Sequence, residues 1–168
     1  MQAGNFPLTP LQGGYLIGVT NAVAALLVIF YIERVGRKTI LVTGQLTMAI
    51  LLFICGYAIM QKWDSVSFTM ILLFIVAYQF SQGSVAWLYV PEICVDAGTG
   101  LAVASQFLNL TLISLTFEYM INSSLGVSGS IWYFSAFTFI GFLFCLFIVK
   151  ETRGLTDIEK KTLYSPKD

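Results

Sequence analysis

Uncharged, apolar stretches alternate with short charged segments along the whole chain. Charged side chains are absent from five runs, at residues 13–32, 39–61, 66–91, 97–117 and 131–149. Each run is close to the roughly 20 residues that an α-helix needs to cross a hydrocarbon core of about 30 Å. Because lipid offers no hydrogen-bond partner to a backbone amide, each run is expected to be helical. The pattern predicts an all-α, polytopic membrane protein.

The limits of these runs divide the chain into three parts. Residues 1–12 are predicted to form an extracellular loop, and residues 155–168 a cytoplasmic tail with at most a brief surface helix. The membrane domain is predicted at residues 13–154, with helices at about 13–32, 39–61, 66–91, 97–122 and 129–149.

The amino-acid composition favours the same class. Hydrophobic residues make up 57% of the chain and charged residues only 11%. A soluble domain has about 25% charged residues, which cover its surface. Here the charges lie between the apolar runs instead of along amphipathic helices, so a soluble core is not favoured.

The basic residues predict the orientation in the membrane. Eight of them follow the first and fifth runs, against Lys62 alone on the other side: Arg34, Arg37, Lys38, Lys150, Arg153, Lys160, Lys161 and Lys167. Since basic loops stay in the cytoplasm, the C-terminus is expected there. With five crossings the N-terminus then lies outside, and this odd count also suits a fragment of a longer protein.

Two apolar runs contain polar residues that need an explanation. Asn21 lies within the first run, where its amide either joins two helices by a hydrogen bond or binds a polar solute. The third run is interrupted by the polar segment 81–84, which reads Ser-Gln-Gly-Ser. Irregular backbone at membrane depth is tolerated where it is buried in protein or lines a cavity. Interrupted helices of this kind frame substrate sites in transporters.

A charged cluster, residues 33–38, follows the first run. Gly36 permits a tight turn, and Glu33 and Arg37 have the spacing of a local ion pair. The cluster is either a simple positively charged anchor or part of an ion-pair network that clamps helices together and opens when they move.

Residues typical of enzymes and metal sites are scarce. The chain contains no histidine, which excludes H-E-x-x-H zinc sites and Ser-His-Asp triads. Its three cysteines are far apart in the sequence and lack metal-ligand spacing. No basic stripe suggests nucleic acid. We therefore expect no enzymatic activity, cofactor, metal site or nucleic-acid partner.

Four ordered motifs carry a family resemblance. They read GVTNAVAALLVIFYIERVGRKTIL, LVTGQLTM, WLYVPEI and ETRGL followed by Ile158-Glu159. The first resembles the eighth helix of the sugar porter family in the major facilitator superfamily and ends in that family's [DE]-R-x-G-R-[RK] signature. The others resemble the ninth helix, the tenth helix and the tail after the twelfth. The chain thus resembles an incomplete C-terminal half of the fold, from the eighth to the twelfth helix.

The resemblance implies a carrier of a hexose or related sugar that works by alternating access. Its partners would be the sugar, the lipid bilayer and the missing N-terminal helices, and its location a membrane, with the plasma membrane expected. The substrate-binding residues implied are Asn21, Trp87, Gln79, Gln82 and Asn109, with Gly83 as a hinge. The glutamines are alternatively helix ties, and Trp87 a space-filling residue.

The same resemblance implies a cytoplasmic charge network. Its members would be Glu33, Arg34, Gly36, Arg37, Glu92, Glu151 and Arg153. Three positions depart from the family pattern: the prolines of G-P-G-P-x-x-W are absent around Gly83, Thr99 stands where an arginine is usual, and Lys150 replaces a proline. Because of Thr99, Glu92 is expected to pair instead with Arg37 or Arg153.

Two alternatives stay open. One is a carrier of a polyol such as inositol, since such carriers share these motifs. The other is a truncated membrane protein that does not transport and only packs against partner helices. Uniport and proton symport are not distinguished by the residues present.

Overall fold

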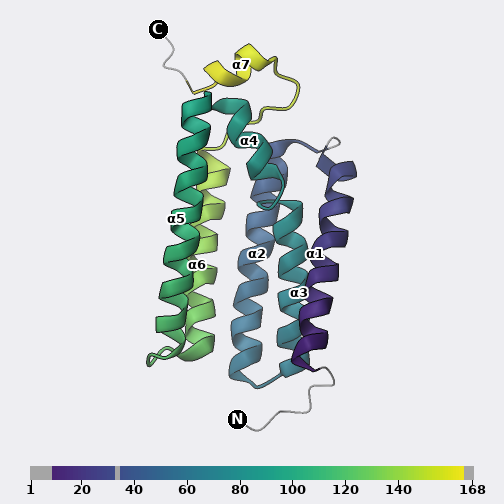
Figure 1. Cartoon of the computed structure of the whole chain (residues 1–168), viewed down its shortest axis with the longest axis vertical. Coiled ribbons are helices and arrows are strands. Elements are labelled where there is room, and N and C mark those ends of the chain that lie inside the picture. The colour runs from purple at the N-terminus through teal and green to yellow at the C-terminus, as the bar shows by residue number, and fades with distance from the viewer. Residues whose placement is uncertain (1–8, 33–34, 165–168) are drawn as a thin grey trace.

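The computed structural model describes residues 9–32 and 35–164. Within them the chain forms seven helices, α1 (Pro10–Ile32), α2 (Arg37–Met60), α3 (Asp64–Phe80), α4 (Val85–Ile93), α5 (Asp96–Ile121), α6 (Gly126–Phe147) and α7 (Asp157–Thr162) (Figure 1). Five stretches of the described residues are long and apolar enough to span a membrane, and α3 and α4 together make one of them. The prediction of an all-α, polytopic membrane protein is confirmed.

The first helix begins earlier than the sequence pattern predicted. Residues 10–12 belong to α1 and not to a loop. Thr9 precedes the helix, its N–H donates to Gln12 Oε1 at 2.9 Å, and the N–H of Gln12 donates to Thr9 Oγ1 at 3.4 Å. This is the reciprocal pattern of a capping box, and Pro10 occupies the first helical position, where its missing N–H costs nothing. Residues 1–8 of the predicted loop lie outside the described residues.

The third predicted helix, 66–91, is in fact two helices. It starts at Asp64, and the backbone leaves the helical path at residues 81–84 between α3 and α4. Ser81 is almost fully buried, and its hydroxyl donates to the carbonyl of Ala77 at 2.8 Å. A Cβ at Gly44 of α2 would overlap the Ser81 side chain, so Gly44 lets this break pack closely against α2.

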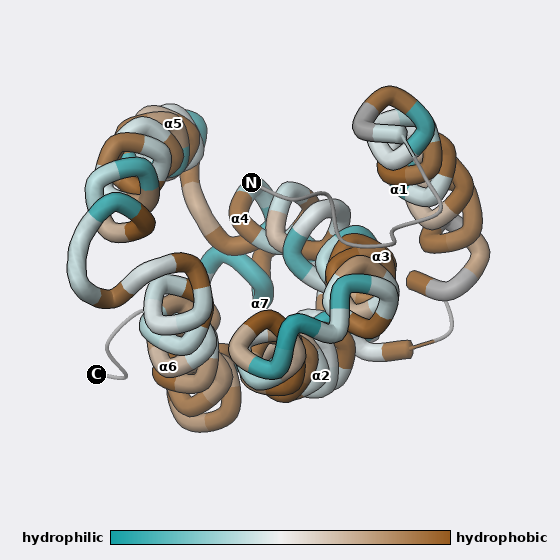
Figure 2. Tube along the Cα trace, turned by 90° about the horizontal axis from the view of Figure 1, so that it is seen from below, coloured by the Kyte–Doolittle hydropathy of each residue, from teal (hydrophilic) through white to brown (hydrophobic). Residues whose placement is uncertain are grey.

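The spanning helices form a curved row. Seen end-on in Figure 2, they follow the order α5, α6, α2, α3 and α1, and each packs against its neighbour in that order. The row therefore has α1 and α5 at its two ends, with α2 in the middle. α4 lies on the inner side of the curve, between α3 and α5.

The α2–α6 contact is the most extensive one. Gly56 permits it, because a Cβ there would overlap the Trp132 ring. Three side chains of α6 donate to backbone carbonyls of α2: Ser128 to Gly56 at 2.6 Å, Trp132 to Phe53 at 3.1 Å and Ser135 to Ala49 at 2.8 Å. Small residues and interhelical hydrogen bonds are what join helices in lipid, where there is no hydrophobic driving force between them.

Candidate functional site

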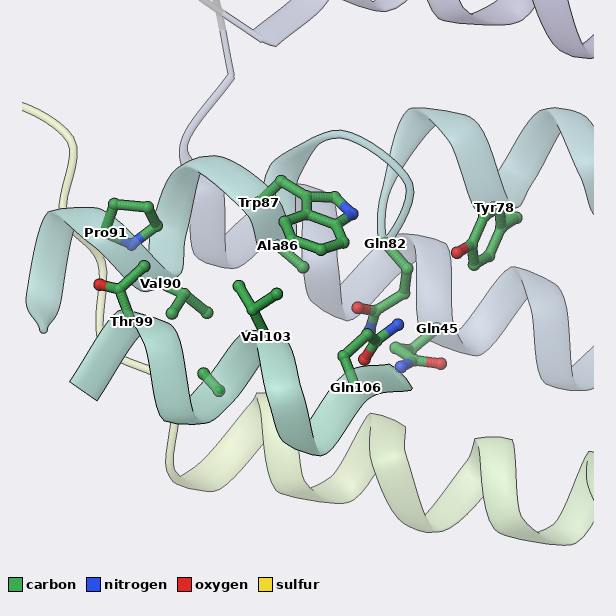
Figure 3. Close-up of a pocket in the computed structure, with 11 residues that line it drawn as sticks. Gln45, Tyr78, Gln82, Ala86, Trp87, Val90, Pro91, Thr99, Val103 and Gln106 are labelled. Atoms are coloured by element: carbon green, nitrogen blue, oxygen red, sulfur yellow. The ribbon is translucent and has the colours of Figure 1, made fainter. Parts of the chain in front are cut away.

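A cavity of about 360 Å³ lies between α4 and α5, with α2 behind it. Its volume falls within the range of about 300–1,000 Å³ that is typical of small-molecule sites. Figure 3 shows the side chains that surround it. They are Gln45, Tyr78, Gln82, Ala86, Trp87, Val90, Pro91, Thr99, Ala102, Val103 and Gln106.

The cavity has an amide-rich end and an apolar end. In Figure 3 the amides of Gln45, Gln82 and Gln106 gather at one end, and Pro91 and Thr99 lie at the other. The Trp87 indole lies above the middle. An apolar cavity with a few convergent polar groups is the usual form of a ligand site.

The position of the break determines which side of α4 faces the cavity. Ala86, Trp87 and Val90 face α5, whereas Val85 and Tyr89 are buried on the opposite side in the core with α2 and α6. Pro91 lies inside α4 and has no N–H to donate to the carbonyl of Trp87, four residues earlier, and the helix ends at Ile93. The serine-rich break thus precedes a short helix that carries the indole, and Pro91 removes one hydrogen bond from that helix.

The structure brings together only some of the predicted binding residues. Trp87 and Gln82 line the cavity, whereas Asn21, Gln79 and Asn109 are not among its lining residues. Asn109 is exposed on α5 and donates to the carbonyl of Ser105 at 2.9 Å, within its own helix.

Asn21 and Gln79 are instead partners of each other. Gln79 Nε2 donates to Asn21 Oδ1 at 2.5 Å, which joins α1 to the end of α3. Gly83 lies against this pair, because a Cβ there would overlap the Gln79 amide. The N–H of Gly83 donates to the carbonyl of Tyr78 at 2.7 Å. The predicted hinge residue is therefore held by the last turn of α3.

Three polar lining residues were not predicted as binding residues from the sequence. They are Gln45, Tyr78 and Gln106. Gln45 is an uncharged polar residue inside an apolar run, as Asn21 is, so the same criterion would have selected it. Gln106 lies three residues before Asn109, which was chosen in its place.

An ion-pair network joins the ends of α2, α4 and α7. Glu92 Oε1 lies 3.2 Å from Arg37 Nη2 and 3.9 Å from Lys160 Nζ. The hydroxyl of the fully buried Thr152 donates to Glu92 Oε2 at 2.7 Å. Of the two predicted partners of Glu92, the structure thus has Arg37. The side chain of Arg153 makes no ion pair with an acidic group in the described part of the chain.

Glu151 binds the beginning of α2. Its carboxylate accepts backbone N–H groups from Arg37 at 2.9 Å and Lys38 at 3.1 Å, and also those of Thr152 and Arg153. An anion at this position compensates the positive end of the helix dipole. Gly36 makes the approach possible, since a Cβ there would overlap the carboxylate. Glu33 and Arg34 lie outside the described residues.

The chain matches a known family over nearly its whole length. The sequence model of the family described as "Sugar (and other) transporter" matches residues 5–164. This chain belongs to that family. The resemblance to the sugar porters is thereby confirmed, and with five candidate spans the chain is a multi-pass membrane protein.

Relatives of the chain include insect and bacterial transporters. The facilitated trehalose transporter Tret1 of Drosophila yakuba is 32% identical over 163 residues, which are 88% of this chain and 19% of that protein. The probable metabolite transport protein CsbC of Bacillus subtilis is 31% identical over 156 residues, 85% of this chain and 33% of that protein.

Solved structures show the same arrangement of helices. The inward-open xylose transporter XylE from E. coli superposes with a TM-score of 0.84 at 31% identity, over 91% of this chain and 36% of XylE. A crystal structure of a D-xylose–proton symporter gives a TM-score of 0.74 at 30% identity, over 83% of this chain and 34% of that one. The chain therefore spans about a third or less of the length of these relatives.

Proposed function

We propose that this chain forms part of a carrier that moves a hexose or related sugar across a membrane by alternating access. The observation that carries the proposal is the cavity between α4 and α5, where an indole and three amides surround a space of about 360 Å³. Membership of a transporter family supports it, as do relatives whose names specify trehalose or xylose.

The cavity suits a sugar because a pyranose ring has apolar faces and a polar rim. The indole of Trp87 offers a flat apolar surface for a ring face. Each glutamine amide offers two N–H donors and a carbonyl acceptor to hydroxyl groups. Gln82 and Gln106 take this role directly. In this proposal the pair Asn21–Gln79 holds α1 against the break, and Gly83 acts as the hinge below α4.

The network around Glu92 serves as a gate in this proposal. Because Arg37 is on α2 and Glu92 is on α4, the ion pair is broken if α4 moves away from α2. Arg37 Nε is buried and has no hydrogen-bond partner in the described part of the chain, which leaves a donor for a further acidic group. Glu151 and the backbone of Arg153 complete the network at the start of α2, on the side we assign to the cytoplasm together with the C-terminus.

Alternating access needs two lobes that rock around a central site. The chain corresponds to 36% of XylE, so the carrier includes further helices that close the cavity from the open side. We assign the remaining contacts to the sugar to those helices. The bilayer surrounds the exposed apolar side chains, which cover much of α1 and α5.

The size of the native polypeptide is the first measurement. An antibody against residues 156–168 is used to probe source membranes. The proposal predicts a band about three times the 18.6 kDa of this chain, from its share of XylE. A band at 18.6 kDa, without co-purifying helices, would favour a membrane protein that packs with partners and does not transport.

Sugar uptake by that native assembly is the second measurement. Trp87→Ala is expected to lower uptake efficiency by about ten- to hundredfold, because the apolar contact between the indole and the sugar ring is lost. Trp63→Ala is the matched control, because Trp63 is exposed just before the start of α3 and does not line the cavity. Equal uptake by both variants would overturn the proposed site. Uptake of inositol in place of hexoses would reassign the solute to the polyols.

A further inference from the structure

Gln45 places a polar group in the cavity from a helix that otherwise supports the fold. α2 packs against α3 on one side and α6 on the other, at the centre of the row of helices (Figure 2). Its neighbouring threonines satisfy their hydroxyls within α2: Thr43 donates to the carbonyl of Thr39 and Thr47 to that of Thr43, both at 2.8 Å. The amide of Gln45 does not bond back in this way.

Gly141 of α6 provides the space for the Gln45 amide. A Cβ built at Gly141 would lie 3.3 Å from Gln45 Nε2 and within 4 Å of the other amide atoms. That separation is tight for a Cβ, so a larger residue at position 141 would displace the amide. The absence of a side chain at Gly141 therefore lets Gln45 lie between α6 and the cavity.

The amide groups of Gln45, Gln82 and Gln106 come together from three separate elements. They belong to α2, to the break between α3 and α4, and to α5, and Figure 3 shows them at one end of the cavity. None of them makes a side-chain hydrogen bond to another group in residues 9–32 and 35–164. An amide without a partner at membrane depth is costly, so these groups require a polar ligand or water.

We propose that Gln45 is a specificity-determining residue of this site, which hydrogen-bonds one hydroxyl of a fully hydroxylated hexose. The inference rests on the proposed sugar site and assigns part of its selectivity. A site built to bind a hydroxyl discriminates strongly against an analogue that lacks it, because the amide is then left unpaired. Gln45 suits this role better than Gln82 or Gln106, because α2 is a regular helix held on both sides, whereas Gln82 lies in the irregular break and α5 is at one end of the row of helices.

Competition by monodeoxy sugars tests the inference in the native assembly that the immunoblot identifies. Labelled glucose is displaced by glucose and by its 2-, 3-, 4- and 6-deoxy analogues. One analogue is expected to compete worse than glucose by about tenfold or more with the unaltered protein. Gln45→Leu should weaken glucose binding by about five- to tenfold and abolish the disadvantage of that one analogue.

The controls separate specificity from folding. Gln45→Met keeps the length of the side chain and removes only its hydrogen bonding, so it should reproduce the Gln45→Leu profile. Gln61→Leu is the matched control at the C-cap of the same helix, outside the cavity, and should leave the affinity of each analogue relative to glucose unchanged. The inference alone would be overturned if the affinity of each analogue relative to glucose were the same in the Gln45 variants as in the unaltered protein. It would also be overturned if Gln61→Leu changed these relative affinities as much as the Gln45 variants do. Absence of hexose binding by the unaltered protein would overturn the proposed function as well.

Discussion

Gly36→Ala tests how the first turn of α2 is held. The backbone at Gly36 has φ −64° and ψ 147°, which any L-residue adopts, so the glycine is not needed for its conformational freedom. It is needed for space, because a Cβ would overlap Oε2 and Cδ of Glu151. The substitution therefore displaces the carboxylate from the start of the helix.

The displaced carboxylate loses its bonds to the N–H groups of Arg37 and Lys38, which are 2.9 and 3.1 Å long. A partly buried anion at a helix terminus stabilises the helix by up to about 2 kcal/mol. Loss of that amount raises the exchange rate of amides in the first turn about 30-fold, if they exchange by local opening.

Hydrogen exchange followed by mass spectrometry on peptides covering residues 36–45 measures this effect in the reconstituted protein. Gly100→Ala is the control, since a Cβ at Gly100 meets no atom within 4 Å and alanine favours a helix. Glu151→Gln keeps an acceptor oxygen without the charge and should give a smaller increase. If Gly36→Ala exchanged no faster than Gly100→Ala, Glu151 would not stabilise α2 and the reasoning would be refuted.

Three further outcomes are expected. Tyr164→Phe removes a hydrogen bond with the Tyr89 hydroxyl at 2.7 Å and one from the N–H of Lys150 at 2.9 Å. Trypsin should therefore cleave at residues 160–161 several-fold faster. Tyr119→Phe, on the exposed face of α5, is the control and should not change the cleavage rate. Ser135→Ala removes the hydrogen bond to the carbonyl of Ala49 and should lower the free energy of unfolding of the detergent-solubilised protein by about 0.6–1 kcal/mol. Ser114→Ala is the control and should have no effect, because the Ser114 hydroxyl bonds within its own helix. Hydrogen bonds from the backbone and hydroxyl of Thr156 hold the pKa of Glu159 below its ordinary value of 4.5. The capping box of α7 should therefore be fully stabilising above that value and weaken as the pH falls through the lowered pKa. An NMR titration should show that the pKa of Glu159 rises only part of the way to its ordinary value in Thr156→Ala, because alanine removes the hydroxyl donor and keeps the backbone N–H, which is the larger cause.

The number of membrane spans and their helical class could be predicted, because both depend on run length and on the absence of charge. The position of the break could also be predicted, since Ser81, Gln82 and Gly83 interrupt an apolar run. The start of α1 was missed, although Thr9 and Gln12 have the spacing of a capping box. The prolines and the low hydropathy near Pro10 led to the prediction of a loop there, and the capping box was not considered.

The full set of residues that line the cavity could not be predicted, because it depends on which side of each helix faces which neighbour. The apolar runs are hydrophobic on all sides, so periodicity does not identify an inward face in lipid-embedded helices. Trp87 was predicted because it matches the tryptophan of the tenth-helix motif, and Gln82 because it lies in the break. Gln45 was missed because it lies on a helix without a break, although the criterion applied to Asn21, a polar residue inside an apolar run, would have selected it.

The short helix α4 links the cavity to the charge network. Trp87 lies in the cavity and Glu92 in the ion pair with Arg37, and the two are five residues apart on one continuous helix. At a rise of about 1.5 Å per residue, they are separated by roughly one and a half turns. If α4 moves as a rigid unit, despite the hydrogen bond that Pro91 cannot donate to Trp87, both residues move with it. Any shift of α4 that moves the indole therefore also changes the distance from Glu92 to Arg37, and Tyr89 transmits the same shift to the carbonyl of Lys150, to which it donates at 2.8 Å.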